Sequence, residues 1–128
     1  MDNNNKISLD QMHDKMRIVQ ELVPGRQITL AHIIANPGDI LYRKLGLDPA
    51  VDHTKSAIGV LTISPHETAI IAADIAIKSS AAELGFVDRF SGTLILTGTV
   101  SAVEASFEAI ATYVRDKLGF TVCNVTRT

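Results

Sequence analysis

One stretch decides the fold: Ala57-Ile58-Gly59-Val60-Leu61-Thr62-Ile63, a nearly continuous apolar run near the middle of the chain. A short run of this kind is typical of a strand that is covered on both faces. Ser64-Pro65-His66-Glu67 follows at once, with the residue types of a helix N-cap, a first helical residue and a capping-box acid. We therefore expect a buried strand that passes directly into a helix.

This helix is expected to run to about Leu84. Gly85 can supply the left-handed residue that ends a helix, and Asp74, Lys78 and Glu83 lie on the polar face. Apolar residues keep a helical spacing along the other face, at Ile70, Ala73, Ile77, Ala81 and Leu84.

A hairpin is expected next. Residues 86–90 and 93–100 have the composition of strands, and Ser91-Gly92 lies between them with glycine where a tight turn needs a positive φ. The sequence therefore predicts two antiparallel strands joined at this dipeptide.

A second long helix follows the hairpin. Ser101-Ala102-Val103-Glu104 repeats the capping-box pattern, and Gly119 is placed to end the helix before a last strand at 120–126. The apolar face of the helix consists of Val103, Phe107, Ile110, Val114 and Leu118.

The region before the central strand predicts two strands and a short helix. Residues 17–23 alternate weakly, and residues 27–35 are rich in β-branched and apolar types. Asn36 can cap a helix that begins at Pro37 and stops at Gly46. Residues 47–56 lack periodicity and indicate a polar connection.

Residues 1–16 form an N-terminal extension to a single domain at 17–128. The few apolar residues of this extension favour a disordered, flexible tail. The alternative is a short amphipathic helix, because Ser8-Leu9-Asp10-Gln11 resembles a capping box. The domain itself predicts an α+β fold, a ferredoxin-like sheet with helices on one side.

Composition excludes several classes of function. The 12 basic and 14 acidic residues are interspersed, so nothing resembles the basic surface that nucleic acid demands. No apolar run approaches the roughly 20 residues needed to span a bilayer. The start of the chain lacks the pattern of a signal peptide, and Cys123 is the one cysteine, so we expect a cytoplasmic protein.

No cofactor, metal site or catalytic constellation is predicted. The histidines are widely separated in sequence, at His13, His32, His53 and His66. Cys123 is interpreted as a packing residue, Glu67 and Glu104 as helix caps, and Asp88 with Arg89 as a solvated pair. The chain is therefore not expected to be an enzyme.

Two longer segments carry a family resemblance. They are Phe86-Val87-Asp88-Arg89-Phe90-Ser91-Gly92 and Arg17-Ile18-Val19-Gln20-Glu21-Leu22-Val23-Pro24-Gly25-Arg26-Gln27-Ile28-Thr29-Leu30-Ala31-His32. From Arg17 to its C-terminus the chain resembles the circularly permuted shell proteins of bacterial microcompartments, of the ethanolamine, propanediol and choline utilisation kind.

The resemblance implies a circularly permuted BMC domain with an extra N-terminal strand, in which 27–45 is moved to the front. It further implies a structural protein whose hexamers tile into a shell around metabolic enzymes. The expected partners are therefore further copies of the chain, other shell proteins and the enclosed enzymes, with neither nucleic acid nor membrane.

Site residues follow from the same resemblance. Asp74 and Lys78 match the helix that meets the neighbouring hexamer, and Phe90, Ser91 and Gly92 match the loop that lines the central pore. Residues 17–23 match a strand that can gather with its symmetry mates into a barrel that occludes this pore. The sequence departs from unpermuted members at residues 35–38, where an arginine between two prolines is missing.

Two other functions are weighed against this one. A ferredoxin-like regulatory module could bind a small anionic metabolite at Ser101, next to Gly98-Thr99-Val100, where helix amides can hold an anion. A small enzyme could use His66 or Asp88 as a base at a subunit interface.

Overall fold

The computed structural model describes residues 25–47 and 56–128. The predicted extension at 1–16, the predicted strand at 17–23 and all but the ends of the polar connection at 47–56 lie outside the described residues. In the described part, no helix is long and apolar enough to cross a membrane.

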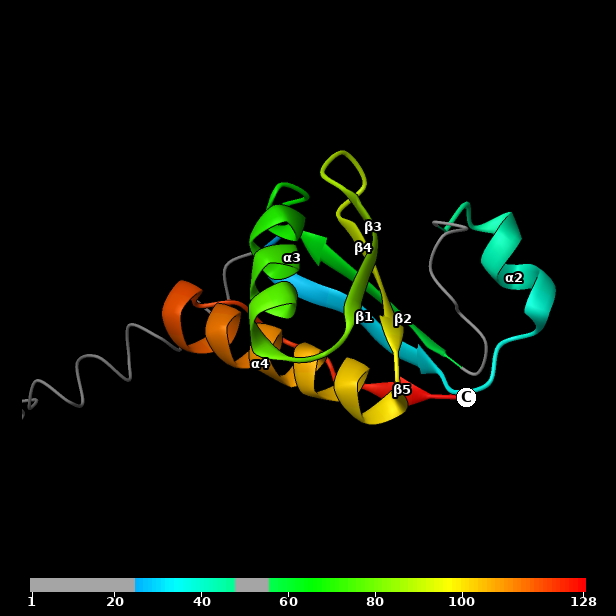
Figure 1. Cartoon of the computed structure of the whole chain (residues 1–128). Coiled ribbons are helices and arrows are strands. Elements are labelled where there is room, and N and C mark those ends of the chain that lie inside the picture. Colours follow the sequence, from blue (N-terminus) through cyan, green and yellow to red (C-terminus); the bar gives the residue numbers. More distant parts are fainter. Residues whose placement is uncertain (1–24, 48–55) are drawn as a thin grey trace, which may run out of the picture.

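The architecture is a five-stranded sheet with two long helices against one face (Figure 1). The strand order is β3-β4-β2-β1-β5. The strands are β1 (Gln27–Ile34), β2 (Ala57–Ser64), β3 (Glu83–Asp88), β4 (Thr93–Gly98) and β5 (Thr126–Arg127). The helices are α2 (Asp39–Lys44), α3 (Thr68–Ser79) and α4 (Val100–Leu118).

The apolar run at 57–63 is the central strand β2, as predicted, but it is not fully covered on both faces of the subunit, since Val60 and Thr62 are only partly buried. It pairs antiparallel with β1 on one side and with β4 on the other, so its backbone groups are satisfied on both edges. Alternate residues of β2 point toward α3 and α4, and Leu61 and Ile63 are almost fully buried there. The confirmed strand therefore forms the middle of the hydrophobic core.

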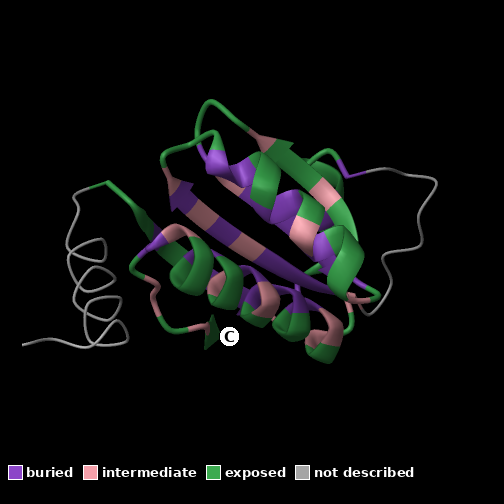
Figure 2. Ribbon diagram, turned by 90° about the vertical axis from the view of Figure 1, so that its left-hand side faces the viewer, coloured by how far each residue is buried: buried purple, intermediate pink, exposed green. Residues whose placement is uncertain are grey.

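Gly59 lets α4 lie close to β2. A Cβ atom at this position would lie 2.8 Å from Cζ of Phe107 and would also collide with the Val103 side chain. Both of these α4 residues are buried, and Figure 2 shows the sheet-facing side of the helix in the buried colour. The predicted apolar face of this helix is confirmed, and Gly119 ends it with φ 73°.

The short helix α2 lies on the opposite side of the sheet from α3 and α4 (Figure 1). Tyr42 and Leu47 pack against Ile58 and Ile95, which face away from the long helices. The Tyr42 hydroxyl donates to the carbonyl of Ser56, and burial together with the nearby Asp39 carboxylate raises the pKa of this tyrosine. The prediction that all helices cover one face is therefore wrong for α2.

The predicted capping boxes are wrong. Ser64 pairs with Gln27 as the last residue of β2, and α3 begins at Thr68 after Glu67, whose side chain makes no cap hydrogen bond. At α4 the cap is Thr99, whose side-chain oxygen accepts a hydrogen bond from the Ala102 backbone N–H at 3.1 Å. Strand pairing keeps Ser64 in β2, and α4 starts after Thr99, two residues before the predicted cap at Ser101. A serine and a glutamate three positions apart are therefore not enough to locate a helix start.

The N-terminus of α2 also differs from the prediction. The helix begins at Asp39, its N-cap is Gly38, and no side chain caps it, so Asn36 lies outside. Gly46 follows the helix with φ 71°, as expected of a stop residue.

The helix α3 ends at Ser79, five residues before the predicted end at Leu84. The Ser80 hydroxyl is 2.5 Å from the Ser106 hydroxyl and donates to the carbonyl of Ala102 at 3.0 Å. It also accepts a hydrogen bond from the backbone N–H of Ala82. These contacts turn the chain into β3, and Gly85 consequently lies inside a strand and does not end the helix.

The last predicted strand, 120–126, is regular only at its end. β5 pairs parallel with β1 at Thr126–Arg127, and upstream of it only an isolated bridge joins Thr121 to Gln27. His32 fixes this end, because its two ring nitrogens lie 2.6 Å and 2.9 Å from the hydroxyls of Thr126 and Thr128.

Candidate functional site

The tip of the β3–β4 hairpin, residues 88–92, is fixed by its own hydrogen bonds. The Asp88 carboxylate accepts from the Phe90 backbone N–H at 2.9 Å and from the Ser91 hydroxyl at 2.8 Å. The Gly92 N–H donates to the Asp88 carbonyl, and the Ile63 N–H donates to the Gly92 carbonyl, both at 2.9 Å. This hairpin tip is therefore anchored both to itself and to the central strand.

These contacts also affect the pKa of the Asp88 carboxyl. Hydrogen bonds from the Phe90 backbone and the Ser91 hydroxyl lower the pKa of this carboxyl, and the nearby His66 lowers it further. A depressed pKa makes the carboxylate a weaker base, and both of its oxygens already accept hydrogen bonds. The structure therefore disfavours Asp88 as a catalytic base.

Gly92 is required at its position. Its φ is +72°, and a Cβ atom there would lie 2.9 Å from Cδ2 of His66 and would collide with the carbonyl oxygen of Ile63. The prediction of a glycine turn is confirmed. The loop after β2 and the hairpin tip consequently pack together with no room for a side chain between them.

Phe90 and Arg89 project from the hairpin tip. Phe90 is the most exposed of the large apolar residues in the described part of the chain, at 76%. The Arg89 guanidinium carbon lies 4.9 Å from the centre of the Phe90 ring, within the range of a cation–π contact. The tip therefore presents an aromatic ring and a cation on a rigid turn.

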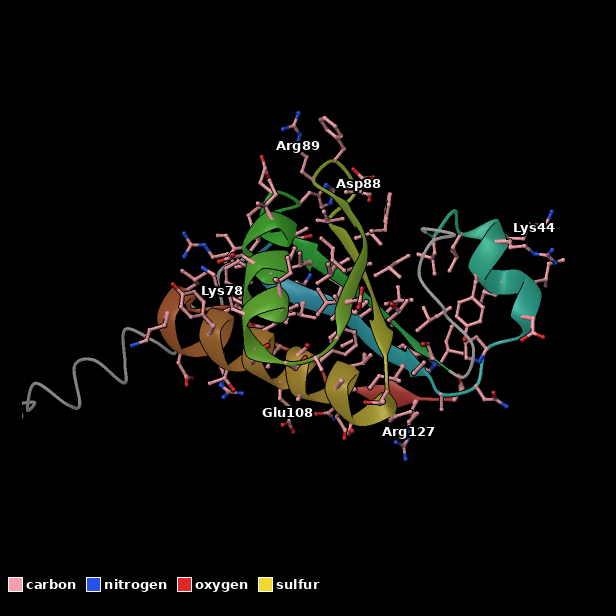
Figure 3. All side chains as sticks on the ribbon, viewed as in Figure 1. Lys44, Lys78, Asp88, Arg89, Glu108 and Arg127 are labelled. Carbon is pink, nitrogen blue, oxygen red and sulfur yellow. The ribbon has the colours of Figure 1, made fainter. Side chains whose placement is uncertain are left out.

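The outer face of α3 carries the second predicted site. Lys78 Nζ lies 2.9 Å from Asp74 Oδ2, and both side chains are mostly exposed. Figure 3 shows Lys78 well away from Asp88 and Arg89, which lie together at the hairpin tip. The structure therefore does not bring the two predicted sites together in one subunit.

In the described part of the chain, the remaining candidate residues do not gather into a cluster. Within residues 25–47 and 56–128, no group of three or more metal-binding side chains lies together. Cys123 is half-buried and packs against the main core. The anion site considered at Ser101 is altered, because Thr99 already uses the Ala102 N–H at the start of α4.

Two features of the structure were not predicted from the sequence. Asp88 was interpreted as part of a solvated pair, although an aspartate that opens a tight turn commonly accepts hydrogen bonds from the turn amides. The exposed apolar side chains of the sheet were also missed, because their common face emerges only from the strand register. Local sequence carries a signal for the first feature and none for the second.

Comparisons with known proteins agree on one family. Residues 57–126 match the sequence model of the family described as BMC domain. The bacterial microcompartment shell protein PduU of Salmonella typhimurium is 55% identical over 112 residues, which cover 88% of this chain and 93% of that protein.

Solved structures with a similar fold include assemblies of CutR, which is also a bacterial microcompartment shell protein. A flat hexamer of CutR (form 1) has a TM-score of 0.75 and 45% identity, and the match covers 84% of this chain and 95% of that one. A screw form of CutR has a TM-score of 0.74 and 47% identity over 82% of this chain and 100% of that one. One subunit fold thus occurs in two kinds of CutR assembly.

Proposed function

The chain belongs to the BMC-domain family of bacterial microcompartment shell proteins, and we propose that it forms hexamers that tile into the shell around metabolic enzymes. The observation that carries this proposal is the agreement between 55% identity to a shell protein and a fold like that of a solved hexamer. The family match begins at β2, so β1 and α2 precede it, which is the element order of a circular permutation.

The proposed role is structural. A head-to-tail contact between identical subunits closes into a ring when its rotation permits and otherwise continues as an open helix. CutR has been solved as a flat hexamer and as a screw, so closely related subunits use both outcomes. We expect this chain to close into rings, and small changes in the subunit contact to open them.

The hairpin tip is the proposed lining of the central opening. The rigid turn around Asp88 supports this assignment, because six copies of a fixed loop can define one opening. Phe90, Ser91 and Gly92 would then face the axis. The expected occlusion by a barrel of residues 17–23 falls outside the described residues and stays a prediction.

The outer face of α3 is the proposed edge between neighbouring hexamers. Its support is that Lys78 and Asp74 are mostly exposed and form an ion pair with each other on the surface of the subunit, so a neighbour can reach them. Without the arginine that unpermuted members have at 35–38, flat tiling of the hexamers is expected to be less secure. The kind of compartment, for ethanolamine, propanediol or choline utilisation, is likewise a prediction.

Sedimentation of the purified protein, followed by electron microscopy of the same sample, tests the proposal. Hexamers that associate into sheets, tubes or closed shells are the expected result. A stable monomer or dimer that forms no array at any concentration would contradict it. Such an outcome would favour the alternative, a ferredoxin-like regulatory module that binds a small anionic metabolite.

A further inference from the structure

The helix α3 buries small side chains and exposes large apolar ones. Its buried residues are one threonine and four alanines, whereas Ile70 is 51% exposed, Ile71 43% and Ile77 55%. Of the residues predicted for its apolar face, Ala73 is buried, and Ile70 and Ile77 are not. Large apolar side chains exposed together are typical of an interaction surface. Ile70, Ile71 and Ile77 are called the isoleucine face below.

The isoleucine face surrounds an ion pair. Ile70 and Ile77 are seven positions apart, which is two helical turns or about 10 Å, so they lie in line along the helix. The Asp74–Lys78 pair lies beside this line on the outer surface. Burying an ion pair without polar contacts is costly. A suitable partner therefore brings apolar groups at helical spacing together with polar or charged groups at their side.

The N-terminal extension has this pattern in its sequence, although it lies outside the described residues. Leu9 and Met16 are also seven positions apart, and Met12 lies between them, so all three would share one face of a helix. Asp10 and Lys15 would flank this face on its two sides. The extension therefore offers apolar groups at the spacing of Ile70 and Ile77, and charges of both signs for the ion pair.

The extension is long enough to reach α3 of its own chain. The described chain begins beside the end of α4, where the Thr121 N–H donates to the Arg26 carbonyl at 3.0 Å (Figure 1). The helix α4 packs against α3. The eight residues 17–24 span at most roughly 28 Å, and a domain of about 100 residues has a radius of gyration of only about 13 Å. The tether therefore permits the contact.

We propose that residues 8–16 pack as an amphipathic helix on the isoleucine face of the same chain, with Leu9 and Met16 against Ile70 and Ile77. A tethered segment is present at an effective concentration in the millimolar range, so a weak contact is enough to order it. A neighbouring hexamer must then displace this helix to reach Lys78. The extension thereby limits tiling, and this consequence rests on the proposed function.

Trypsin cleavage after Lys15 measures the contact in the full chain. A free tail is cut readily, whereas a helix packed on α3 is cut only when it detaches. Cleavage of the unsubstituted protein is expected to be about tenfold slower than that of Leu9→Glu or Ile77→Glu, because each variant places a charge in the contact. The protection should not depend on protein concentration, since the contact lies within one chain.

Two matched controls accompany these variants. Gln11→Glu adds the same charge on the opposite side of the proposed helix. Ile40→Glu replaces an isoleucine on α2 that is 56% exposed, close to the 55% of Ile77. Both variants should keep the slow cleavage of the unsubstituted protein.

Electron microscopy over a series of protein concentrations measures the effect on tiling. Leu9→Glu lies outside the described fold and leaves α3 intact, so its hexamers should still form. Its arrays are expected to appear at a concentration up to about tenfold lower, because every edge is then uncovered. Gln11→Glu should form arrays at the same concentration as the unsubstituted protein.

The outcomes separate this inference from the proposed function. Equally fast cleavage of the unsubstituted protein, Leu9→Glu and Ile77→Glu would overturn the contact and leave the isoleucine face to a neighbouring hexamer. Protection that Leu9→Glu abolishes without any change in array formation would overturn the effect on tiling. If the unsubstituted protein forms no hexamers, the proposed function is contradicted instead, while the cleavage rates still report on the contact.

Discussion

The hairpin tip at 88–92 and the outer face of α3 at 74–78 are both exposed and charged, yet they are held in different ways. The hairpin tip is fixed by four short hydrogen bonds, two of which reach the Asp88 carboxylate. The α3 face has one exposed ion pair. The hairpin tip, which is the proposed pore lining, is thus stabilised by several hydrogen bonds within the subunit. The outer face of α3, which is the proposed edge between hexamers, is held by one exposed ion pair that a neighbour could reach.

The largest expected effect on the stability of the subunit comes from Gly92→Ala. The substitution strains a left-handed residue and drives a methyl group into Ile63 and His66, so we expect a loss of about 2–5 kcal/mol. Urea unfolding measures it. Gly38→Ala is the control, because its Cβ would meet nothing within 4 Å, and a loss below about 1 kcal/mol is expected there. Equal losses at both positions would show that the hairpin tip is not tightly packed.

A smaller effect is expected for Asp88→Ala. The variant loses the acceptor for the Phe90 N–H and the Ser91 hydroxyl, so amide hydrogen exchange at Phe90 should accelerate while exchange in β2 stays unchanged. Asp88→Asn keeps one carbonyl oxygen as acceptor and should restore part of the protection. Protection that is the same in all three proteins would mean that the carboxylate does not shape the loop.

The same carboxylate gives the hairpin tip a defined pH dependence. Because its folded-state pKa is lowered, the stabilisation is present above the ordinary aspartate value of about 3.9 and is lost as pH falls through the lower folded value. An NMR titration of the Asp88 carboxyl carbon in the unsubstituted protein should show its midpoint below that ordinary value. A midpoint at or above it would contradict the hydrogen-bonded loop.

The smallest effect on stability is expected for Lys78→Ala. An exposed pair of this kind contributes about 0–1 kcal/mol, so the unfolding midpoint and the hexamer should both be retained. Association between hexamers should weaken, and the extent of sheets seen by electron microscopy reports it. Lys78→Arg keeps the charge and is the control. Arrays that are unchanged in Lys78→Ala would remove this residue from the proposed edge.

Elements that depend on neighbouring residues were predicted correctly, and boundaries that depend on residues distant in sequence were not. β2 and the apolar face of α4 were predictable, because periodicity and β-branched composition act over a few neighbouring residues. The end of α3 was not, because Ser80 finds its partners at Ala102 and Ser106, which are 22 and 26 positions away. Capping patterns failed for the same reason at Ser64, which strand pairing with Gln27 keeps in β2.

By itself, the sequence determined the central strand, the turn glycines at Gly46, Gly92 and Gly119, and the resemblance that identified the family. These depend on local backbone preference and on residue types that are read one position at a time. Only the tertiary structure decided where α3 ends, which oxygens hold the hairpin tip, and which face of the sheet stays open. Register and packing set all three, because they join residues that are distant in sequence and adjacent in space.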